Sequence, residues 1–137
     1  MTILFIKCTR RRRCQLTGGH TLSFLQKNLV KLSGKLVLRE SFDEELLKQE
    51  LTEFGFSGSP LRATNPWYFR KKNTETWIKI GESSDRENWF SVPWDTTSLE
   101  NGAYQVLGLM HVFIKEGNSE LVLCRQNMVD VKVENPV

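Results

Sequence analysis

Short runs of alternating apolar and polar residues fill the C-terminal two thirds of the chain, which is the pattern of half-buried β-strands. Turn sequences rich in Gly, Asn and Ser separate these runs. The runs are VKLSGKLVLRES, WYFRKK, TWIKIGE, NWFSVPW, AYQVLGLMHVFIK and ELVLCRQNMVDVKVEN. Strands at this regular spacing predict an all-β fold, and a β-sandwich rather than a barrel.

One segment, SFDEELLKQELTEFG, has helical periodicity instead. Ser41 and Glu44 form a capping-box pattern, and Gly55 supplies a stop. Its apolar residues recur at helical spacing and are Leu47, Leu51 and Phe54. The pattern predicts one α-helix, from about Asp43 to Phe54, between the second and third strands of the sandwich. We expect the following segment, GFSGSPLRATNP, to be a loop.

A connection between two strands is predicted in SVPWDTTSLENGAYQV. Trp94 ends one strand, and hydroxyl or carboxyl side chains follow that can bond a turning backbone. Gly102 supplies a positive φ before the next strand. The ring of Tyr104 can fill the edge of the core while its hydroxyl bonds back to the turn. The signature residues of this connection are Trp94, Asp95, Thr96, Gly102 and Tyr104.

Four pieces of the sequence resemble, in order and spacing, the bacterial immunoglobulin-like (Ig-like) modules. They are LSGKLVLRES, TWIKIGESS, WDTTSLENGAYQV and MVDVKVEN. The resemblance implies an Ig-like antiparallel β-sandwich over residues 28–137. It also implies a spacer, adhesion or sugar-binding accessory role and exposure at the cell surface or outside the cell. The inserted helix departs from the family pattern.

Residues 1–27 read as a separate basic arm or leader. The whole chain of 137 residues carries a net charge of +3. Its basic block consists of Lys7, Arg10, Arg11, Arg12 and Arg13, and the remainder is slightly acidic. Such a block can neutralise phosphates, so it is the candidate anion or nucleic-acid contact, although no aromatic residue is interleaved with it. The apolar run ILFI is too short for a signal-peptide core, which speaks against export.

No catalytic constellation is visible. His111 lies in mid-strand without a paired carboxylate or Cys nearby in sequence, so we interpret it as structural. We expect Cys124 to be a small buried residue, and we favour unpaired thiols for Cys8, Cys14 and Cys124 over a Cys8–Cys14 bridge, which an oxidising compartment would allow. Acidic residues in GESSDREN, namely Glu82, Asp85 and Glu87, are read as a solvated turn rather than a calcium loop. We therefore expect no enzyme activity, cofactor or metal.

Alternation divides the strand AYQVLGLMHVFIK into two faces. One face, toward the core, carries Tyr104, Val106, Met110, Val112 and Ile114. The other carries Leu107, Leu109, His111 and Phe113, which is too apolar for a face open to water. Either the inserted helix or another protein covers it, and we favour the helix because its own apolar stripe needs burial.

The sequence thus favours a non-catalytic module for protein recognition, adhesion or assembly, with Leu107, Leu109, His111 and Phe113 as the candidate partner interface. An accessory carbohydrate-binding module is one alternative, because one residue of each aromatic pair, Trp67/Tyr68 and Trp89/Phe90, should face outward. A nucleic-acid binder acting through the basic arm is the other, less favoured alternative.

Overall fold

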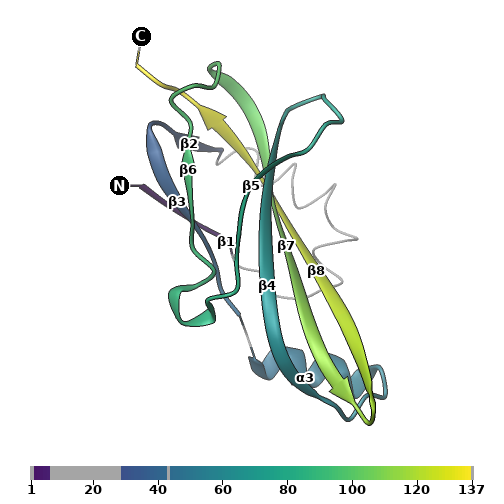
Figure 1. Cartoon of the computed structure of the whole chain (residues 1–137). Helices are drawn as coiled ribbons and strands as arrows, with labels where there is room; N and C mark the ends of the chain where they lie inside the picture. Colours follow the sequence, from purple (N-terminus) through teal and green to yellow (C-terminus); the bar gives the residue numbers. More distant parts are fainter. Residues whose placement is uncertain (1, 7–28, 43, 137) are drawn as a thin grey trace.

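The computed structural model describes residues 2–6, 29–42 and 44–136 (Figure 1). Within these ranges the helices are α3 (Glu44–Glu53) and a short 3-10 helix, η2 (Arg86–Asn88). The strands are β1 (Thr2–Ile6), β2 (Val30–Leu32), β3 (Lys35–Glu40), β4 (Ser59–Lys71), β5 (Ile78–Ser83), β6 (Val92–Asp95), β7 (Gly102–Glu116) and β8 (Ser119–Val133). No helix in the described ranges is long and apolar enough to cross a membrane.

The strands form two sheets, with orders β1-β3-β6 and β2-β8-β7-β4-β5. The pairs among β3 to β8 are antiparallel, as predicted. The edge strands β1 and β2 pair in parallel with β3 and β8, which the antiparallel prediction did not include. The prediction of an all-β fold with an inserted α-helix is confirmed for the described residues: α3 lies between β3, which contains the predicted second strand of the sandwich, and β4, which contains the predicted third.

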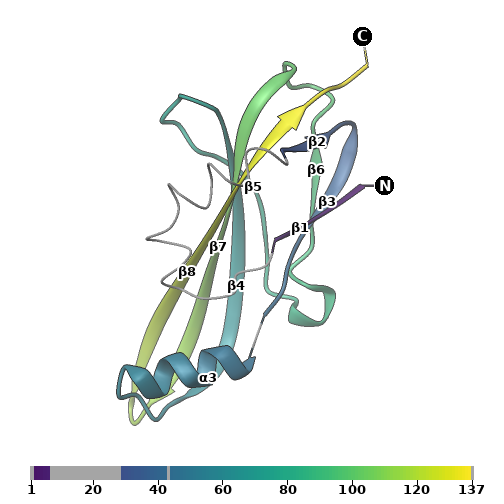
Figure 2. The same ribbon diagram turned by 180° about the vertical axis from the view of Figure 1, so that it is seen from behind.

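Two apolar clusters lie against the same face of the long strand β7. The first, here called the two-sheet half, joins both sheets and centres on Leu36, Leu38, Trp67, Val92, Trp94, Tyr104, Val106, Val131 and Val133. The second, here called the helix half, joins α3 to the sheet and consists of Leu47, Leu51, Phe90, Met110, Val112 and Ile114. Figures 1 and 2 show α3 lying across one end of β4, β7 and β8, and β3 and β6 beside the other end.

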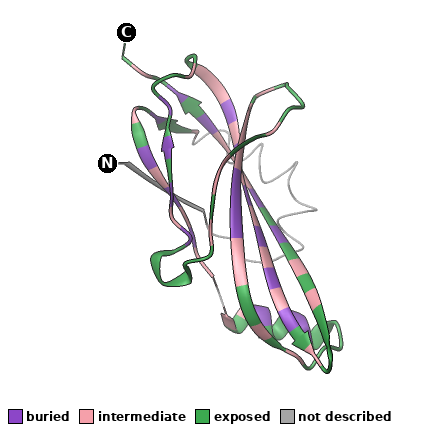
Figure 3. Cartoon of the chain, in the orientation of Figure 1, coloured by how far each residue is buried: buried purple, intermediate pink, exposed green. Residues whose placement is uncertain are grey.

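The strand β7 confirms the predicted alternation. Its core-side residues, Tyr104, Val106, Met110, Val112 and Ile114, are all buried, and the intervening residues are half-buried (Figure 3). Because β7 has 15 residues while β3 has six and β6 has four, the second sheet cannot cover the whole face. The remainder of that face needs another cover, and α3 supplies it.

The favoured position of the helix was therefore wrong. Leu47 and Leu51 pack with Met110, Val112 and Ile114, on the core face, and not against Leu107, Leu109 and Phe113. Phe54, predicted as part of the helical stripe, lies beyond the end of α3 and is 50% exposed. The helix covers the part of the core face that β3 and β6 do not reach. It does not cover the opposite face of β7.

Two other predictions differ from the structure. The strand β4 begins at Ser59, inside the predicted loop, because the long β7 offers pairing partners from His111 to Lys115 to the residues before Asn65. The run NWFSVPW was predicted as one strand, but η2 and two left-handed residues, Trp89 and Phe90, precede β6. The carboxylate of Asp85 accepts from the backbone N–H of Asn88 at 3.3 Å, which stabilises this turn instead of a strand.

Candidate functional site

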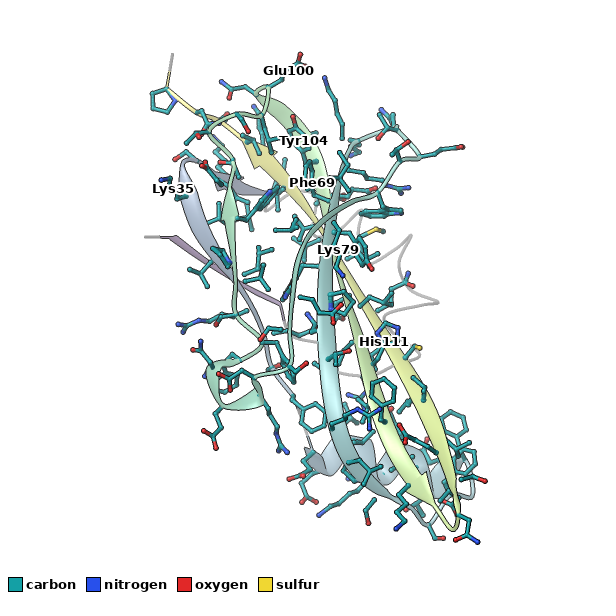
Figure 4. The ribbon with its side chains drawn as sticks, viewed as in Figure 1. Lys35, Phe69, Lys79, Glu100, Tyr104 and His111 are labelled. Atoms are coloured by element: carbon teal, nitrogen blue, oxygen red, sulfur yellow. The ribbon has the colours of Figure 1, made fainter. Side chains whose placement is uncertain are left out.

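The signature connection has the predicted local structure. The Tyr104 hydroxyl donates to the Glu100 carbonyl oxygen at 2.7 Å, while the Tyr104 ring is buried beside Phe69 (Figure 4). Gly102 has φ +146°, in the region that favours glycine. Trp94 packs its ring against Phe69 in the same cluster. These residues join β6 to β7 and are structural.

The hydroxyl and carboxyl residues after Trp94 hold the turning backbone. Thr96 is fully buried, and its hydroxyl donates to the Gly34 carbonyl oxygen at 2.6 Å. Asn135 donates from its side-chain amide to the Thr96 carbonyl oxygen, which ties the end of the chain to the same turn. Hydrogen bonds from the Thr97 hydroxyl and backbone lower the pKa of the exposed Asp95 carboxyl.

The predicted partner interface lies on the opposite, outer face of the five-stranded sheet. Cross-strand register places β7 residues beside β8 and β4 residues on this face. We define the outer face as Leu107, Leu109, His111 and Phe113 of β7, Val122, Cys124, Gln126 and Met128 of β8, and Arg62, Thr64 and Tyr68 of β4. Neither apolar cluster of the described residues includes any of these side chains. Figure 4 shows His111 midway along β7.

Charged and polar pairs lie at both ends of the outer face. At one end, the Arg62 guanidinium donates to the Glu120 carboxylate at 2.8 Å and lies 4.0 Å from the centre of the Phe113 ring. At the other end, Arg70 donates to Gln105 at 2.7 Å, and Gln105 donates to Asp130 at 3.1 Å. Each end thus carries an arginine engaged with polar partners, with the apolar residues between the two ends, and an exposed lysine, Lys115 or Lys132, lies near each end on the same side.

The prediction of a buried Cys124 was wrong, because Cys124 is exposed on the outer face as a free thiol, opposite His111. Alternation along β8 explains this position. The neighbouring inward positions belong to Arg125 and Asn127, both buried. The sequence predicted no catalytic role for this thiol or for His111, and His111 is a half-buried strand residue.

A buried polar cluster lies between the two apolar clusters, and sequence analysis missed it. Its members come from four elements and are Glu40 of β3, Glu50 of α3, Asn65 of β4, and Arg125 and Asn127 of β8. All five residues are buried, and Glu40 is only 1% exposed. Buried charged groups are rare unless they are paired, so this cluster is the least ordinary feature of the core.

Hydrogen bonds satisfy only part of this cluster. Asn127 donates to Glu40 Oε1, and Arg125 donates to the Glu50 carboxylate at 2.8 Å with both side chains almost fully buried. Glu40 Oε2, Arg125 Nε and both polar side-chain atoms of Asn65 have no hydrogen-bond partner. Burial raises the pKa of the Glu40 carboxyl from 4.5 to about 7, against smaller lowering effects from Asn127, Arg125 and Asn65.

The signal for this cluster was present in the sequence. Glu40 follows Leu36 and Leu38 with strand period, and Arg125 and Asn127 share their parity with Val131 and Val133. Glu50 falls between Leu47 and Leu51 on the apolar side of the helix. Alternation alone therefore placed charged residues inside, but polar side chains are ordinarily assigned to the surface.

The remaining predicted residues have ordinary surroundings or lie outside the described ranges. Glu82 pairs with Lys79 at 3.1 Å, and Asp85 caps η2. Within the described residues no group of three or more His, Cys, Asp and Glu is placed to hold a metal ion. Trp67 is buried with Tyr68 half-buried, as strand alternation predicted. Phe90 is buried and Trp89 is 45% exposed, but these two residues lie before β6 and not in a strand. The arm residues Lys7, Arg10, Arg11, Arg12 and Arg13 and the cysteines Cys8 and Cys14 lie outside the described residues.

No protein-family model matches the chain, and no curated protein matches its sequence.

Proposed function

We propose that the chain is a non-catalytic Ig-like module that binds another protein through the outer face. The strand arrangement supports the Ig-like part of the proposal. The strands that correspond to the second and fifth of an Ig domain, β3 and β6, share one sheet, and those that correspond to the third, sixth and seventh, β4, β7 and β8, share the other. The Tyr104 to Glu100 hydrogen bond matches the tyrosine corner of such domains.

The single observation that carries the binding role is the apolar middle of the outer face. Leu107, Leu109 and Phe113 lie in a row on β7, and Val122 and Met128 flank them on β8. A sheet face open to water ordinarily alternates to polar side chains, and contiguous apolar patches on monomers mark interaction sites. The helix α3 covers the other face, so among the described residues it leaves this row to a partner.

The charge pattern selects the kind of partner. Arg62 pairs with Glu120, and Arg70 is linked through Gln105 to Asp130, so both arginines at the ends of the apolar middle already have polar partners within the chain. An apolar sheet surface whose arginines are engaged in this way is best matched by the apolar face of a β-sheet in another protein subunit. We therefore assign the outer face to sheet-on-sheet packing with such a subunit.

Site-specific photo-crosslinking tests this assignment. A photoreactive phenylalanine analogue replaces Val122, which is 50% exposed in the outer face, in the full chain within the cells that produce it. We expect one protein adduct of defined mass, which disappears when Leu109→Asp is added. A probe at Ile78, equally exposed on the edge strand β5, is the matched control and should give no such adduct.

The outcomes distinguish the candidate functions. An adduct of twice the chain mass identifies a second copy as the subunit. Failure of Val122 to crosslink any protein, or an adduct that survives Leu109→Asp, would overturn the assignment. Glycan or nucleic-acid adducts in place of protein would favour the carbohydrate-binding or basic-arm alternatives.

A further inference from the structure

The buried polar cluster contains an imbalance of charge. It holds one guanidinium, from Arg125, and two carboxyl groups, from Glu40 and Glu50. Both carboxyl groups ionised would leave a net charge of −1 inside the core, where an uncompensated charge is costly. The cluster is neutral only when one carboxyl group holds a proton, and Glu50 already pairs with Arg125 at 2.8 Å. The proton therefore belongs on Glu40.

Glu40 occupies the boundary between the two-sheet half and the helix half. It is the last residue of β3, and its backbone N–H donates to the Trp89 carbonyl oxygen at 3.0 Å. Its Oε2 would lie 3.2 Å from a Cβ placed on Gly108, at the height on β7 between Val106 and Met110. Trp67 and Asn127 pair with Gly108 from either side. The carboxyl group thus contacts the sheet where the two apolar clusters meet.

We propose that this cluster is a proton-controlled latch that holds α3 against the sheet when Glu40 is protonated and releases α3 when Glu40 is ionised. The protonated carboxyl is neutral and its Oε1 accepts from Asn127, while Oε2 has no hydrogen-bond partner. Arg125 then pairs with Glu50, and this ion pair joins α3 to β8.

Loss of the proton to water gives Arg125 a second anion to pair with. Arg125 carries a single positive charge and can neutralise only one of the two carboxylates, and its Nε, which has no partner in the closed arrangement, is the donor that turns toward Glu40. A move of Arg125 toward Glu40 neutralises the new charge and frees Glu50. The helix then loses its one buried ion pair with the sheet, and the apolar residues Met110, Val112 and Ile114 become accessible.

Few other groups bear on this exchange. The groups that act on the Glu40 carboxyl are the neutral amides of Asn127 on β8 and Asn65 on β4 and the charged Arg125 on β8, and the Trp67 ring lies beside the same point of β7. Glu50 on α3 is linked to the cluster through its ion pair with Arg125. His111 faces the opposite side of the sheet. Burial places the titration of Glu40 near neutral pH, since the pKa of its carboxyl is raised to about 7.

Amide hydrogen exchange of the full chain tests the latch, with protection corrected for the intrinsic effect of pH. The amides of Leu47 and Leu51 report on α3, and those of Val106 and Val131 report on the two-sheet half. Between pH 5.5 and pH 8.5 we expect the protection of α3 to fall by about tenfold or more relative to the two-sheet half. The helix should recover its protection when the pH is lowered again.

Three variants separate the latch from general instability. Glu40→Gln should keep α3 protected at both pH values, because the amide stays neutral. Glu50→Gln should leave α3 poorly protected at both, because Arg125 then pairs with Glu40 permanently. Glu45→Gln, an exposed change on the same helix, is the matched control and should keep the wild-type pH response. Equal protection ratios in the wild type at pH 5.5 and pH 8.5 would overturn the latch, as would a pH response that persists in Glu40→Gln or, should that variant not fold, in Glu50→Gln.

Discussion

The two halves of the core bury the same face of one sheet by different means. In the two-sheet half, side chains from β3 and β6 meet those from β4, β7 and β8. The side chains of this cluster are apolar apart from the hydroxyl group of the tyrosine and the ring N–H groups of the tryptophans. In the helix half, one short helix supplies Leu47 and Leu51 beside a buried ion pair. Buried ion pairs add little net stability, because desolvation offsets their attraction. The helix half is therefore expected to open more readily than the two-sheet half.

The two halves also differ in how they respond to pH. A cluster of apolar residues responds only weakly to pH, whereas a boundary that contains Glu40, Glu50 and Arg125 changes its charge when a proton is lost. The outer face lies on the other side of the same strands, so binding there and opening of α3 involve different surfaces. The predictions below test this contrast between the halves.

The largest effect is expected for Leu38→Ala in the two-sheet half. Leu38 has no exposed surface and pairs in register with Val92 between the two sheets. Truncation of a fully buried leucine removes apolar contacts and leaves a cavity, so the free energy of unfolding should fall by about 4 kcal/mol. Urea unfolding followed by circular dichroism should show one transition at a lower midpoint, with helix and strand signals lost together.

The matched variant in the helix half is Leu47→Ala, since Leu47 is also fully buried. We expect this change to weaken the packing of α3 against the sheet by about 3 kcal/mol, and to affect the rest of the fold much less. Helical signal and exchange protection in α3 should decrease while Val106 and Val131 remain protected. Coincident loss of both halves in this variant would show that the core is one cooperative unit and would contradict the contrast.

Sequence pattern predicted most of the architecture because the inward residues of β7 and the turn residues after Trp94 are local signals. Alternation predicted which β7 residues are buried, and the Ser41–Gly55 segment predicted the helix to within one residue at each end. The position of the helix was not predictable in this way. It depends on how far β7 and β8 extend beyond β3 and β6, which is a property of three-dimensional pairing and not of any one segment.

The candidate sites divide along the same line. The outer face of β7 could be predicted from the sequence, because Leu107, Leu109 and Phe113 are more apolar than a face open to water requires. Cys124 was assigned inward and Arg125 was not considered, because residue type was given more weight than strand parity. The cluster around Glu40 combines four elements distant in sequence, so only tertiary structure could bring its members together.

An intermediate effect is expected for the pH dependence of stability, with Glu40→Gln as the comparison. The folded pKa of Glu40 is raised to about 7 from 4.5, so its contribution to stability is fully present below pH 4.5 and is lost as pH rises through 7. The shift corresponds to an upper limit of about 3 kcal/mol between pH 4.5 and pH 8. Unfolding free energies measured across this range should fall in the wild type and stay nearly level in Glu40→Gln.

Other carboxyls do not mimic this slope. The pKa values of Asp95, Glu44, Glu100 and Glu134 are lowered, so the stability they contribute is lost as pH falls through those lowered values, below the range of interest. A wild type and a Glu40→Gln variant with parallel pH profiles would show that Glu40 ionises equally well in the folded and unfolded chain.

The smallest effect is expected for Tyr104→Phe, which tests the connection that joins the two sheets rather than the contrast in their packing. The change removes the hydroxyl that donates to the Glu100 carbonyl oxygen at 2.7 Å and keeps the ring beside Phe69. Loss of one hydrogen bond at a partly buried turn should lower the free energy of unfolding by about 1 kcal/mol. Because Tyr104 belongs to the two-sheet half, the midpoint of the whole transition should shift while the relative protection of α3 stays constant. A selective loss of α3 protection in this variant would show that the turn after β6 supports the helix half as well, and that the two halves are coupled through β7.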